Sequence, residues 1–406
     1  MTATRPELLS PAGDMERLQM ALTFGANAVY LSGKQFGMRG GCSNFDEAGL
    51  RKAVEMCHAK NVRVHVTVNT LPRDHEMVEM PAYMELLNDI GVDALIVADL
   101  GVFNLGKKYA PNCELHVSTQ TGIVNSATAE GWYDLGAKRV VLAREMSLDD
   151  IIHLRQHTPK DLEIETFIHG SMCVSFSGRC LLSNYMTGRD GNRGVCAQPC
   201  RWKYALMEEK RPGQYFPIFE TEQGTYIMNS RDLCMIDHVP ELIDAGIDAL
   251  KIEGRNKSSY YTAIVTNAYQ HAITAAMNGE PLLPVWRDEV EKVSHRNYYT
   301  GFYFDIPGNS QFYEESRYIR HWQISAYVLS CEEDGTAVLT QRNRFSVGDW
   351  VELVTPDGEP IPFQVEYMEN AEGESIEACP HAQQEIHLKL PCYAPENSIL
   401  RRKDWH

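Results

Sequence analysis

The sequence predicts a (β/α)8 barrel followed by a small antiparallel β-domain. Over the first two-thirds of the chain, short apolar segments alternate with amphipathic helical segments, and a glycine recurs at every second helix-to-strand junction. After about residue 310 the pattern changes to short alternating strands with turn signals. A chain of 406 residues is also longer than one compact core usually holds. We therefore expect a barrel at 1–310 and a second domain at 311–406.

Eight segments have the length and apolar content of buried parallel strands. They are 7–9, 28–31, 62–68, 94–98, 114–117, 139–143, 163–168 and 249–252. Each of the first six is followed by a helical pattern, for example at 15–24, 45–60 and 77–90, which is the repeat of parallel βα units. A doubly wound open sheet is the main alternative, because short apolar strands do not show whether a sheet closes.

Four glycines stand where a helix gives way to a strand: Gly25, Gly91, Gly136 and Gly246. A glycine at this place ends the helix in the left-handed conformation and lets the chain turn. The four precede the second, fourth, sixth and eighth strand candidates. A period of two βα units favours a closed barrel, with a long insertion after the seventh strand.

The last hundred residues have the pattern of a small antiparallel barrel. Strands are expected at 324–328, 350–354, 361–367 and 386–390, with turns at 334–335 and 356–358. Such a module could guide an RNA stem or could simply stabilise the chain, since a fold alone does not define a function.

Composition indicates a cytoplasmic protein that has no contact with membranes. No apolar run reaches the ~18 residues that span a bilayer, and the first residues lack the apolar core of a secretory signal. An odd count of 11 cysteines favours a reducing compartment. The net charge of -17 disfavours general nucleic-acid binding, so an RNA substrate would need a local basic patch. The residues do not define an oligomeric state.

Four cysteines lie within the insertion predicted at 169–225. Cys173, Cys180, Cys196 and Cys200 form a C-x6-C-x15-C-x3-C array, and four thiolates in one short segment can converge on one soft metal centre. Zinc sites usually draw their ligands from C-x2-4-C pairs, and only the last two cysteines approach that spacing. The wider gaps favour an iron–sulfur cluster. Four buried structural thiols are the remaining alternative.

Basic residues surround these cysteines in an otherwise acidic chain. Such a rim lowers the pKa of nearby thiols and offers an anion a docking surface. A solvated loop with ordinary salt bridges is the alternative for each residue taken singly. The candidates for RNA contact are Arg179, Arg189, Arg193, Arg201 and Lys203.

A closed barrel carries active-site residues where its strands end and its βα loops begin. By that rule His169, Glu253 and Glu145 are the candidate catalytic residues. The candidate substrate-binding residues, which suit a dicarboxylate because guanidinium groups bind carboxylates through two hydrogen bonds, are Arg39, Arg144, Arg255, Gln120 and Lys251. For the charges of the eighth strand, a buried ion pair is the alternative. Likewise His65 and His116, which lie within strands, are more typical of core residues.

The sequence resembles the collagenase-like peptidase family over nearly its whole length. The matching segments are 165–170, Cys173, 178–183, 194–196 and 200–202, with further blocks at 7–13, 226–233 and 251–255. Two blocks in the tail, 344–349 and 368–371, are most similar to the branch of tRNA uridine hydroxylation proteins. The resemblance implies a 4Fe-4S cluster on the four cysteines, tRNA as partner, and prephenate as hydroxyl donor for 5-hydroxyuridine at the wobble position.

Other functions remain open on the sequence alone. A peptidase, as the older family name suggests, would need a nucleophile or metal motif, and neither GxSxG nor HExxH occurs. Hydroxylation of ribosomal RNA or of a quinone precursor is a further alternative, and so is a structural cluster in an RNA-binding scaffold. Cys234 or Cys42 could replace Cys200 as a ligand, although the array itself is complete.

Overall fold

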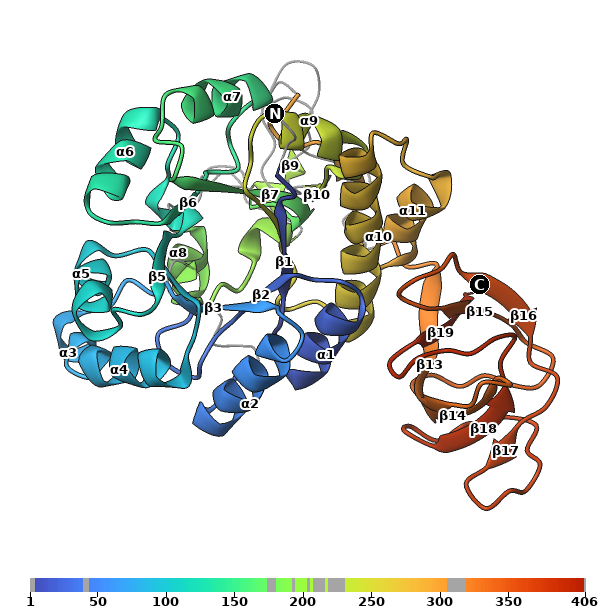
Figure 1. Ribbon diagram of the computed structural model, residues 1–406. Helices are drawn as coiled ribbons and strands as arrows, with labels where there is room; N and C mark the ends of the chain where they lie inside the picture. Colours follow the sequence, from blue (N-terminus) through green and yellow to red (C-terminus); the bar gives the residue numbers. More distant parts are fainter. Residues whose placement is uncertain are drawn as a thin grey trace.

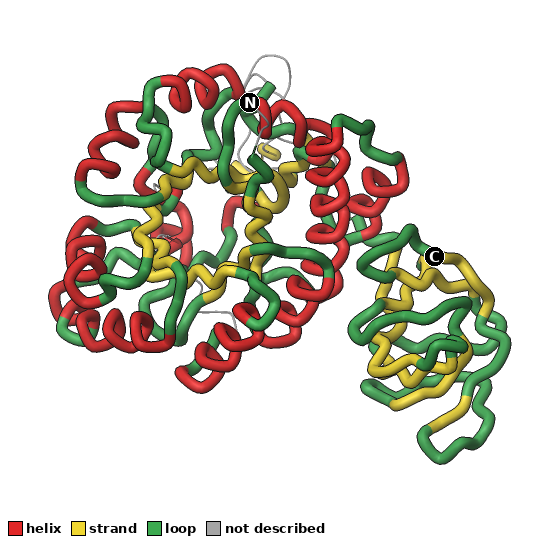
Figure 2. Tube along the Cα trace, viewed as in Figure 1, coloured by secondary structure: helices red, strands yellow, loops and turns green. Residues whose placement is uncertain are grey.

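A computed structural model describes residues 4–38, 44–173, 180–191, 194–202, 205–206, 216–217, 231–304 and 319–404. Its first part is a ring of eight parallel strands surrounded by helices (Figures 1 and 2). The strands are β1 (Glu7–Pro11), β2 (Ala28–Leu31), β3 (Arg63–Val68), β4 (Ala94–Val97), β5 (Glu114–Val117), β6 (Arg139–Val141), β7 (Glu163–Ser171) and β11 (Ala249–Ile252).

The ring is closed by β11, which pairs in parallel with β1 on one side and with β7 on the other. The predicted (β/α)8 barrel is therefore confirmed, and the open-sheet alternative is excluded. Four glycines precede the second, fourth, sixth and eighth strands of the ring, which are β2, β4, β6 and β11. All four have positive φ, between 76° and 104°. This left-handed conformation confirms their predicted place at helix ends.

The helices that follow the strands run along the outside of the ring (Figure 2). They are α1 (Met15–Thr23), α2 (Glu47–His58), α3 (Asp74–Met77), α4 (Met80–Ile90), α5 (Leu100–Tyr109), α6 (Ser126–Asp134), α7 (Leu148–Gln156), α9 (Val239–Asp244) and α10 (Ser259–Asn278), with α11 (Pro284–Glu289) beyond them. The helix expected at 77–90 begins later, at Met80, and the short α3 ends at Met77. Pro81, in the first turn of α4, lacks the N–H that a continuous helix would need there.

Two strands that the sequence did not predict extend the sheet beside β7, one in the long connection between β7 and β11 and one after α11. β10 (Asp232–Cys234) runs antiparallel to the end of β7, and β12 (Tyr298–Tyr299) pairs with β10. The same connection holds α8 (Leu182–Thr187), the 3-10 turn η3 (Pro199–Arg201) and the short pair β8 (Ala205–Leu206) and β9 (Phe216–Pro217). With nine residues, β7 is long enough to pair within the ring and also, at its end, with β10.

The tail forms a seven-stranded antiparallel sheet with a hydrophobic core of its own. Its order is β16 (Ile361–Gln364), β15 (Trp350–Val354), β19 (Ile399–Lys403), β13 (Trp322–Cys331), β14 (Thr336–Gln341), β18 (Glu385–Lys389) and β17 (Glu369–Asn370). This sheet lies beside α10 and α11 (Figure 1). Its antiparallel architecture agrees with the sequence prediction.

A buried ion pair joins the two parts. Arg401, on β19, is fully buried, and its two Nη atoms lie 2.6 and 2.5 Å from the carboxylate oxygens of Glu289 on α11. Its Nε also donates to Glu352 on β15, at 2.9 Å. Burial alone would raise the pKa of Glu289, but Arg401 and Lys292 hold that pKa below its usual value. One buried guanidinium thus links α11 to two strands of the tail sheet.

Candidate active site at the barrel mouth

The cysteine segment begins at the carboxyl end of β7 and lies at the mouth of the barrel. Cys173 follows β7 by two residues. Further along, Gly194 packs against the loop after β2 so closely that a Cβ there would stand 2.0 Å from the carbonyl oxygen of Met38. The N–H of Met38 in turn donates to Asn69 Oδ1 at 3.2 Å, just beyond β3. The segment thus contacts the βα loops, on the face where barrel active sites lie.

The four cysteines of the array are more exposed than the other described thiols of the barrel. Cys173 is exposed and the remaining three of the array are partly exposed, whereas Cys57, Cys113 and Cys234 are buried. Burial raises the pKa of the Cys57 thiol to about 12. In the array, by contrast, the N–H of Gln198 donates to Cys196 Sγ at 3.3 Å. An N–H directed at sulfur stabilises a thiolate, so this donor set suits a metal centre.

The array is held together by packing between α8 and η3. The Oγ of Ser183 on α8 accepts the N–H of Ala197, at 2.9 Å, and a Cβ added to Gly191 would stand 3.6 Å from Cys196 Sγ. Cys180 comes just before α8 and Cys200 lies in η3. Three of the four cysteines therefore border one small packed unit, as a cluster's ligands must.

Arg144 and Glu253 form a loose ion pair at the mouth, between β6 and β11. Arg144 Nη2 lies 3.6 Å from Glu253 Oε2, Nη1 donates to the carbonyl of Ser171 at 3.1 Å, and the guanidinium lies 3.9 Å from the centre of the Phe167 ring. The Nε of Arg144 is buried without a hydrogen-bond partner among the described residues. Because its ion pair with Glu253 is long, Nη2 is the group that can bind an incoming carboxylate. Glu145, next in the chain, is half-buried.

The other predicted substrate residues occupy different depths of the barrel. Arg255 is buried, and its Nη1 donates to Thr67 Oγ1 at 2.8 Å. Gln120 accepts a hydrogen bond from Asn69 Nδ2 at 2.7 Å, beside Ser118. Lys251 lies deeper, where its Nζ donates to Glu165 at 2.8 Å, so it forms the buried ion pair considered as the alternative. Its substrate role stays a prediction. Arg39 and Cys42 lie outside the described residues.

His169 faces away from the mouth. Its ring nitrogens lie 3.3 Å from the hydroxyls of Tyr269 on α10 and Tyr298 on β12. The reason is an irregularity in the pairing of β7 with β11: Lys251 pairs with Phe167, but the next residue of β11 pairs with His169. One extra residue in β7 changes the side that the following side chain faces. This position gives His169 a packing role, and its catalytic role stays a prediction.

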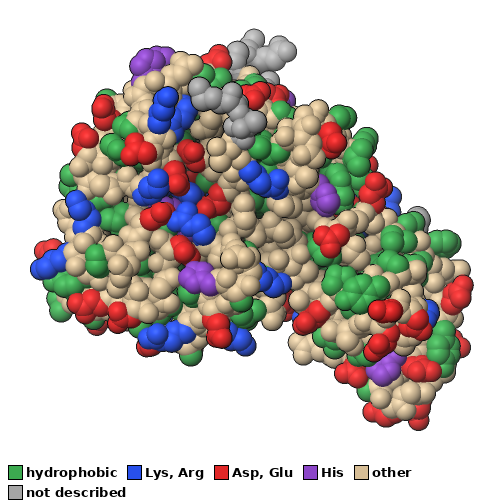
Figure 3. Space-filling model, in the orientation of Figure 1, with side chains coloured by type: hydrophobic (Ala, Val, Ile, Leu, Met, Phe, Trp, Pro, Cys, Tyr) green, Lys and Arg blue, Asp and Glu red, His purple; other side chains and the backbone are tan. Residues whose placement is uncertain are grey.

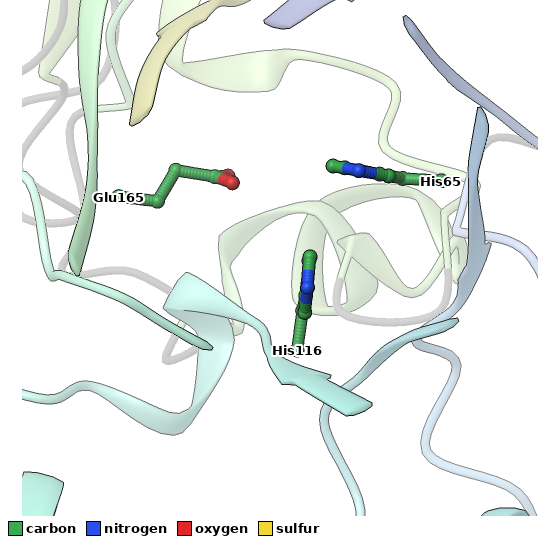
Figure 4. A group of neighbouring side chains, drawn as sticks. All are labelled: His65, His116 and Glu165. Carbon is green, nitrogen blue, oxygen red and sulfur yellow. The ribbon is translucent and has the colours of Figure 1, made fainter. Parts of the chain in front are cut away.

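Inside the barrel lies a charged layer that the sequence pattern did not predict. His65, His116 and Glu165 extend toward one another from β3, β5 and β7 (Figure 4), and their ligand atoms lie within 4.8 Å of one another. The carboxylate of Glu165 already accepts from Lys251 at 2.8 Å and from Arg139 at 3.0 Å. Because two protein cations already bind this carboxylate, a metal ion would be a third positive charge there and is disfavoured. We therefore interpret these three residues as a structural charge layer. The sequence feature that could have predicted this layer is the alternation of charged and apolar residues along β7.

Burial of His65, His116 and His169 leads to a pH prediction. Burial first, and nearby cations second, hold the pKa of each well below its usual value. The unfolded chain therefore binds more protons below about pH 6.5, and the free energy of unfolding should fall as the pH falls, by up to about 1.4 kcal/mol per pH unit for each histidine. Above that pH this contribution is constant. Urea unfolding between about pH 7.5 and 5.5 measures the slope.

The matched variants are His65→Asn and His153→Asn. The first removes one buried titrating ring and should reduce the slope by roughly a third, since three rings share it. The second removes an exposed histidine on α7 and should leave the slope unchanged. Equal slopes in wild type and His65→Asn would contradict the prediction.

Two of the five predicted RNA-contacting residues lie among the described residues. Arg189 is exposed, and its Nε donates to the carbonyl of Val195 at 2.9 Å, which ties the end of α8 to the residue before Cys196. Arg201 belongs to η3. Arg179, Arg193 and Lys203 lie outside the described residues. On the face seen in Figure 3, acidic and basic side chains are intermixed over the barrel, which is not the pattern of a broad nucleic-acid surface.

The same segment exposes large apolar side chains near the mouth. Tyr185 on α8 is 88% exposed, Leu181 is 72% exposed and Trp202 is 46% exposed. Exposed aromatic rings beside an active site are suited to stacking on an unpaired base.

The chain combines a (β/α)8 barrel, a cysteine-bearing insertion at the mouth of the barrel and a small β-domain. This combination defines a class of barrel proteins with an enzyme-like site. Comparison with known protein families then shows which family the chain belongs to. It matches peptidase family U32 over residues 13–312 and the C-terminal domain of that family over 320–401. The chain belongs to peptidase family U32.

Curated relatives in this family carry names that refer to RNA. The chain is 36% identical to tRNA hydroxylation protein P1 of Bacillus subtilis, over 98% of this chain and 95% of the relative. It is also 36% identical to tRNA hydroxylation protein P of Escherichia coli, over 95% and 94%. A 23S rRNA 5-hydroxycytidine synthase of Escherichia coli is 38% identical over 68% of this chain and 40% of its own length. Separately, the described helices include none that is long and apolar enough to cross a bilayer.

Proposed function

We propose that this chain is an RNA hydroxylase that converts the wobble uridine of tRNA into 5-hydroxyuridine. The relatives that align over nearly the whole chain are named as tRNA hydroxylation proteins, and one that aligns over 68% of the chain is named for an RNA hydroxylation product. The observation that carries the proposal is the position of the cysteine segment, which packs on the βα loops beside Arg144 and Glu253. In this proposal the protein acts in the cytoplasm.

The proposed cofactor is a 4Fe-4S cluster on Cys173, Cys180, Cys196 and Cys200. A cluster with four cysteine ligands supplies one-electron redox chemistry when it is bound. The donor set supports it, because these thiols are accessible and one of them accepts an N–H hydrogen bond. Cys234 is a weaker candidate ligand: it is buried 3.9 Å from Tyr269 Oη, and burial raises its pKa to about 11.

The proposed co-substrate is prephenate, a dicarboxylate. Arg144 makes only a loose ion pair with Glu253 through Nη2, so this group can bind one carboxylate. Arg255, buried at the carboxyl end of β11, supplies a second cation lower in the mouth. A base of the anticodon loop is unpaired and can be splayed out, and Tyr185 and Trp202 offer rings for stacking.

Nucleoside mass spectrometry tests the proposal. Total tRNA from cells that lack the gene should lose 5-hydroxyuridine and its derivatives, and a plasmid copy of the wild-type gene should restore them. A copy with Cys173→Ala should fail to restore them, because one cluster ligand is missing. A copy with Cys392→Ala, an exposed cysteine of the tail domain, should restore them fully.

Other outcomes point to other functions. Unchanged tRNA in the deletion strain would reject the proposal, and ribosomal RNA would be analysed next, then quinones, then peptide cleavage. Full restoration by the Cys173→Ala copy would reject the role of the array. For the co-substrate, cells blocked before prephenate should lose the modification, and added prephenate should restore it.

A further inference from the structure

A cleft lies where the tail domain meets the barrel. It has a volume of about 470 Å³, which is in the range of sites for small ligands or single nucleotides. One wall is the loop from β11 into α10, at Asn256 to Ser259, with Glu16 of α1 beside it. The other wall comes from Arg320, β13 and the Arg342–Asn343 turn after β14. The cleft is therefore shared between the two family domains.

The charge of the cleft is opposite to that of the chain. Three cations line it, Lys257, Arg320 and Arg342, against the single carboxylate of Glu16. Arg342 uses one Nη to bind Glu16 at 2.9 Å and lies 4.7 Å from the centre of the Tyr327 ring. Arg320 is exposed at the rim. The Nζ of Lys257 also lies 3.7 Å from Oδ2 of the buried Asp232. In a protein with a net charge of -17, a cleft whose lining has three cations against one carboxylate is still a local site for an anion.

The remaining lining can donate hydrogen bonds to phosphate or ribose oxygens. Ser258 and Ser294 supply hydroxyls and Gln323 supplies an amide. By contrast, Ser259 Oγ already donates to Glu16, and Asn343 Nδ2 already donates to the carbonyl of Ile324. The amino terminus of α10, a helix of 20 residues, also opens here, and its dipole adds a further partial positive charge.

The loop after β11 connects the cleft with the mouth of the barrel. The loop after β11 carries Glu253 and Arg255 at the mouth and Lys257 in the cleft. Four residues of chain, from Glu253 to Lys257, span at most about 14 Å. That distance corresponds to a few nucleotides of RNA backbone, so a strand with one base in the mouth can reach the cleft.

We propose that this cleft binds backbone phosphates of the RNA next to the target nucleotide. The proposal rests on the proposed function, because it takes RNA as the substrate. It also gives the tail domain a specific role in RNA binding. Arg320 and Arg342 contribute half of a phosphate site whose other half, Lys257 and the serines, belongs to the barrel.

Salt-dependent RNA binding tests the cleft. The probe is an anticodon stem-loop RNA with uridine at the wobble position, titrated with the full-length protein by fluorescence anisotropy. The Arg320→Gln/Lys257→Gln double variant should bind roughly tenfold more weakly, and the slope of log affinity against log salt should fall by about 2, one for each phosphate that is no longer neutralised. Arg51→Gln, an exposed arginine on α2, should behave as wild type.

The outcomes separate the two proposals. Wild-type affinity and wild-type salt slope in the double variant, with normal circular dichroism, would overturn the cleft proposal and leave the hydroxylase proposal intact. A wild-type protein that does not bind the stem-loop at low salt would overturn both. An equal loss of affinity in Arg51→Gln would also overturn the cleft proposal, because the effect would then report net charge alone.

Discussion

Replacing Arg401 with alanine should lower the free energy of unfolding by about 3–5 kcal/mol. The guanidinium is fully buried and binds Glu289 with two hydrogen bonds, and Glu289 is itself 1% exposed. Without Arg401 this carboxylate, and Glu352 beside it, would remain at the junction with only Lys292 to offset their charge. Urea unfolding followed by tryptophan fluorescence measures the loss.

Arg402→Ala is the matched control. It removes the neighbouring arginine, whose Nη1 lies 2.8 Å from Asp349 in a partly exposed pair with side chains 27% and 32% exposed. Such a pair contributes about 1 kcal/mol or less. If both variants lost the same free energy of unfolding, the buried pair would not be the special feature of the junction. A double Arg401→Met/Glu289→Leu variant should recover much of the loss, because no buried charge remains unpaired.

Iron and acid-labile sulfide in anaerobically purified protein should fall to background in Cys200→Ala and stay at the wild-type level in Cys234→Ala. Cys200 lies in η3, which packs on α8 beside Cys196. Cys234 lies on β10, opposite His169 on β7, in the hydrophobic core. A cluster that loses one of four thiolate ligands is no longer held firmly.

Both variants are assayed for folding as well as for iron. Cys234→Ala should lose some stability, since it removes a buried thiol, but it should keep its iron. Cys200→Ala should keep the circular dichroism of the barrel. Full iron retention without Cys200 would contradict its place in the ligand set, and a drop only in Cys234→Ala would transfer that place to Cys234.

The architecture was predictable because closed barrels repeat one pattern. Each ring strand is a short apolar segment, and glycines such as Gly91 and Gly246 mark the joins by a backbone conformation that other residues avoid. The cysteine array and Arg144 could be placed at the mouth by one rule, that βα loops follow strand ends. These features depend on local sequence and a single topological choice.

The rest depended on pairing between distant strands. The outward orientation of His169 follows from a register shift between β7 and β11, which local alternation does not reveal. The partners of Glu165, which are Lys251 on β11 and Arg139 on β6, are likewise set by ring closure. β10 was missed because three residues beside a nine-residue strand leave no periodic signal.

The place of the insertion also sets an order of events during synthesis. The last ring strand, β11, begins at Ala249, whereas β7 ends at Ser171, and the cysteine segment lies between them. At about 5–20 residues per second, a ribosome needs roughly 4–15 s to make the intervening chain. All four cysteines are synthesised during that time, while the ring is still open. The chain therefore presents its cysteines to solvent, and to whatever delivers iron and sulfide, before the barrel that they cover can close.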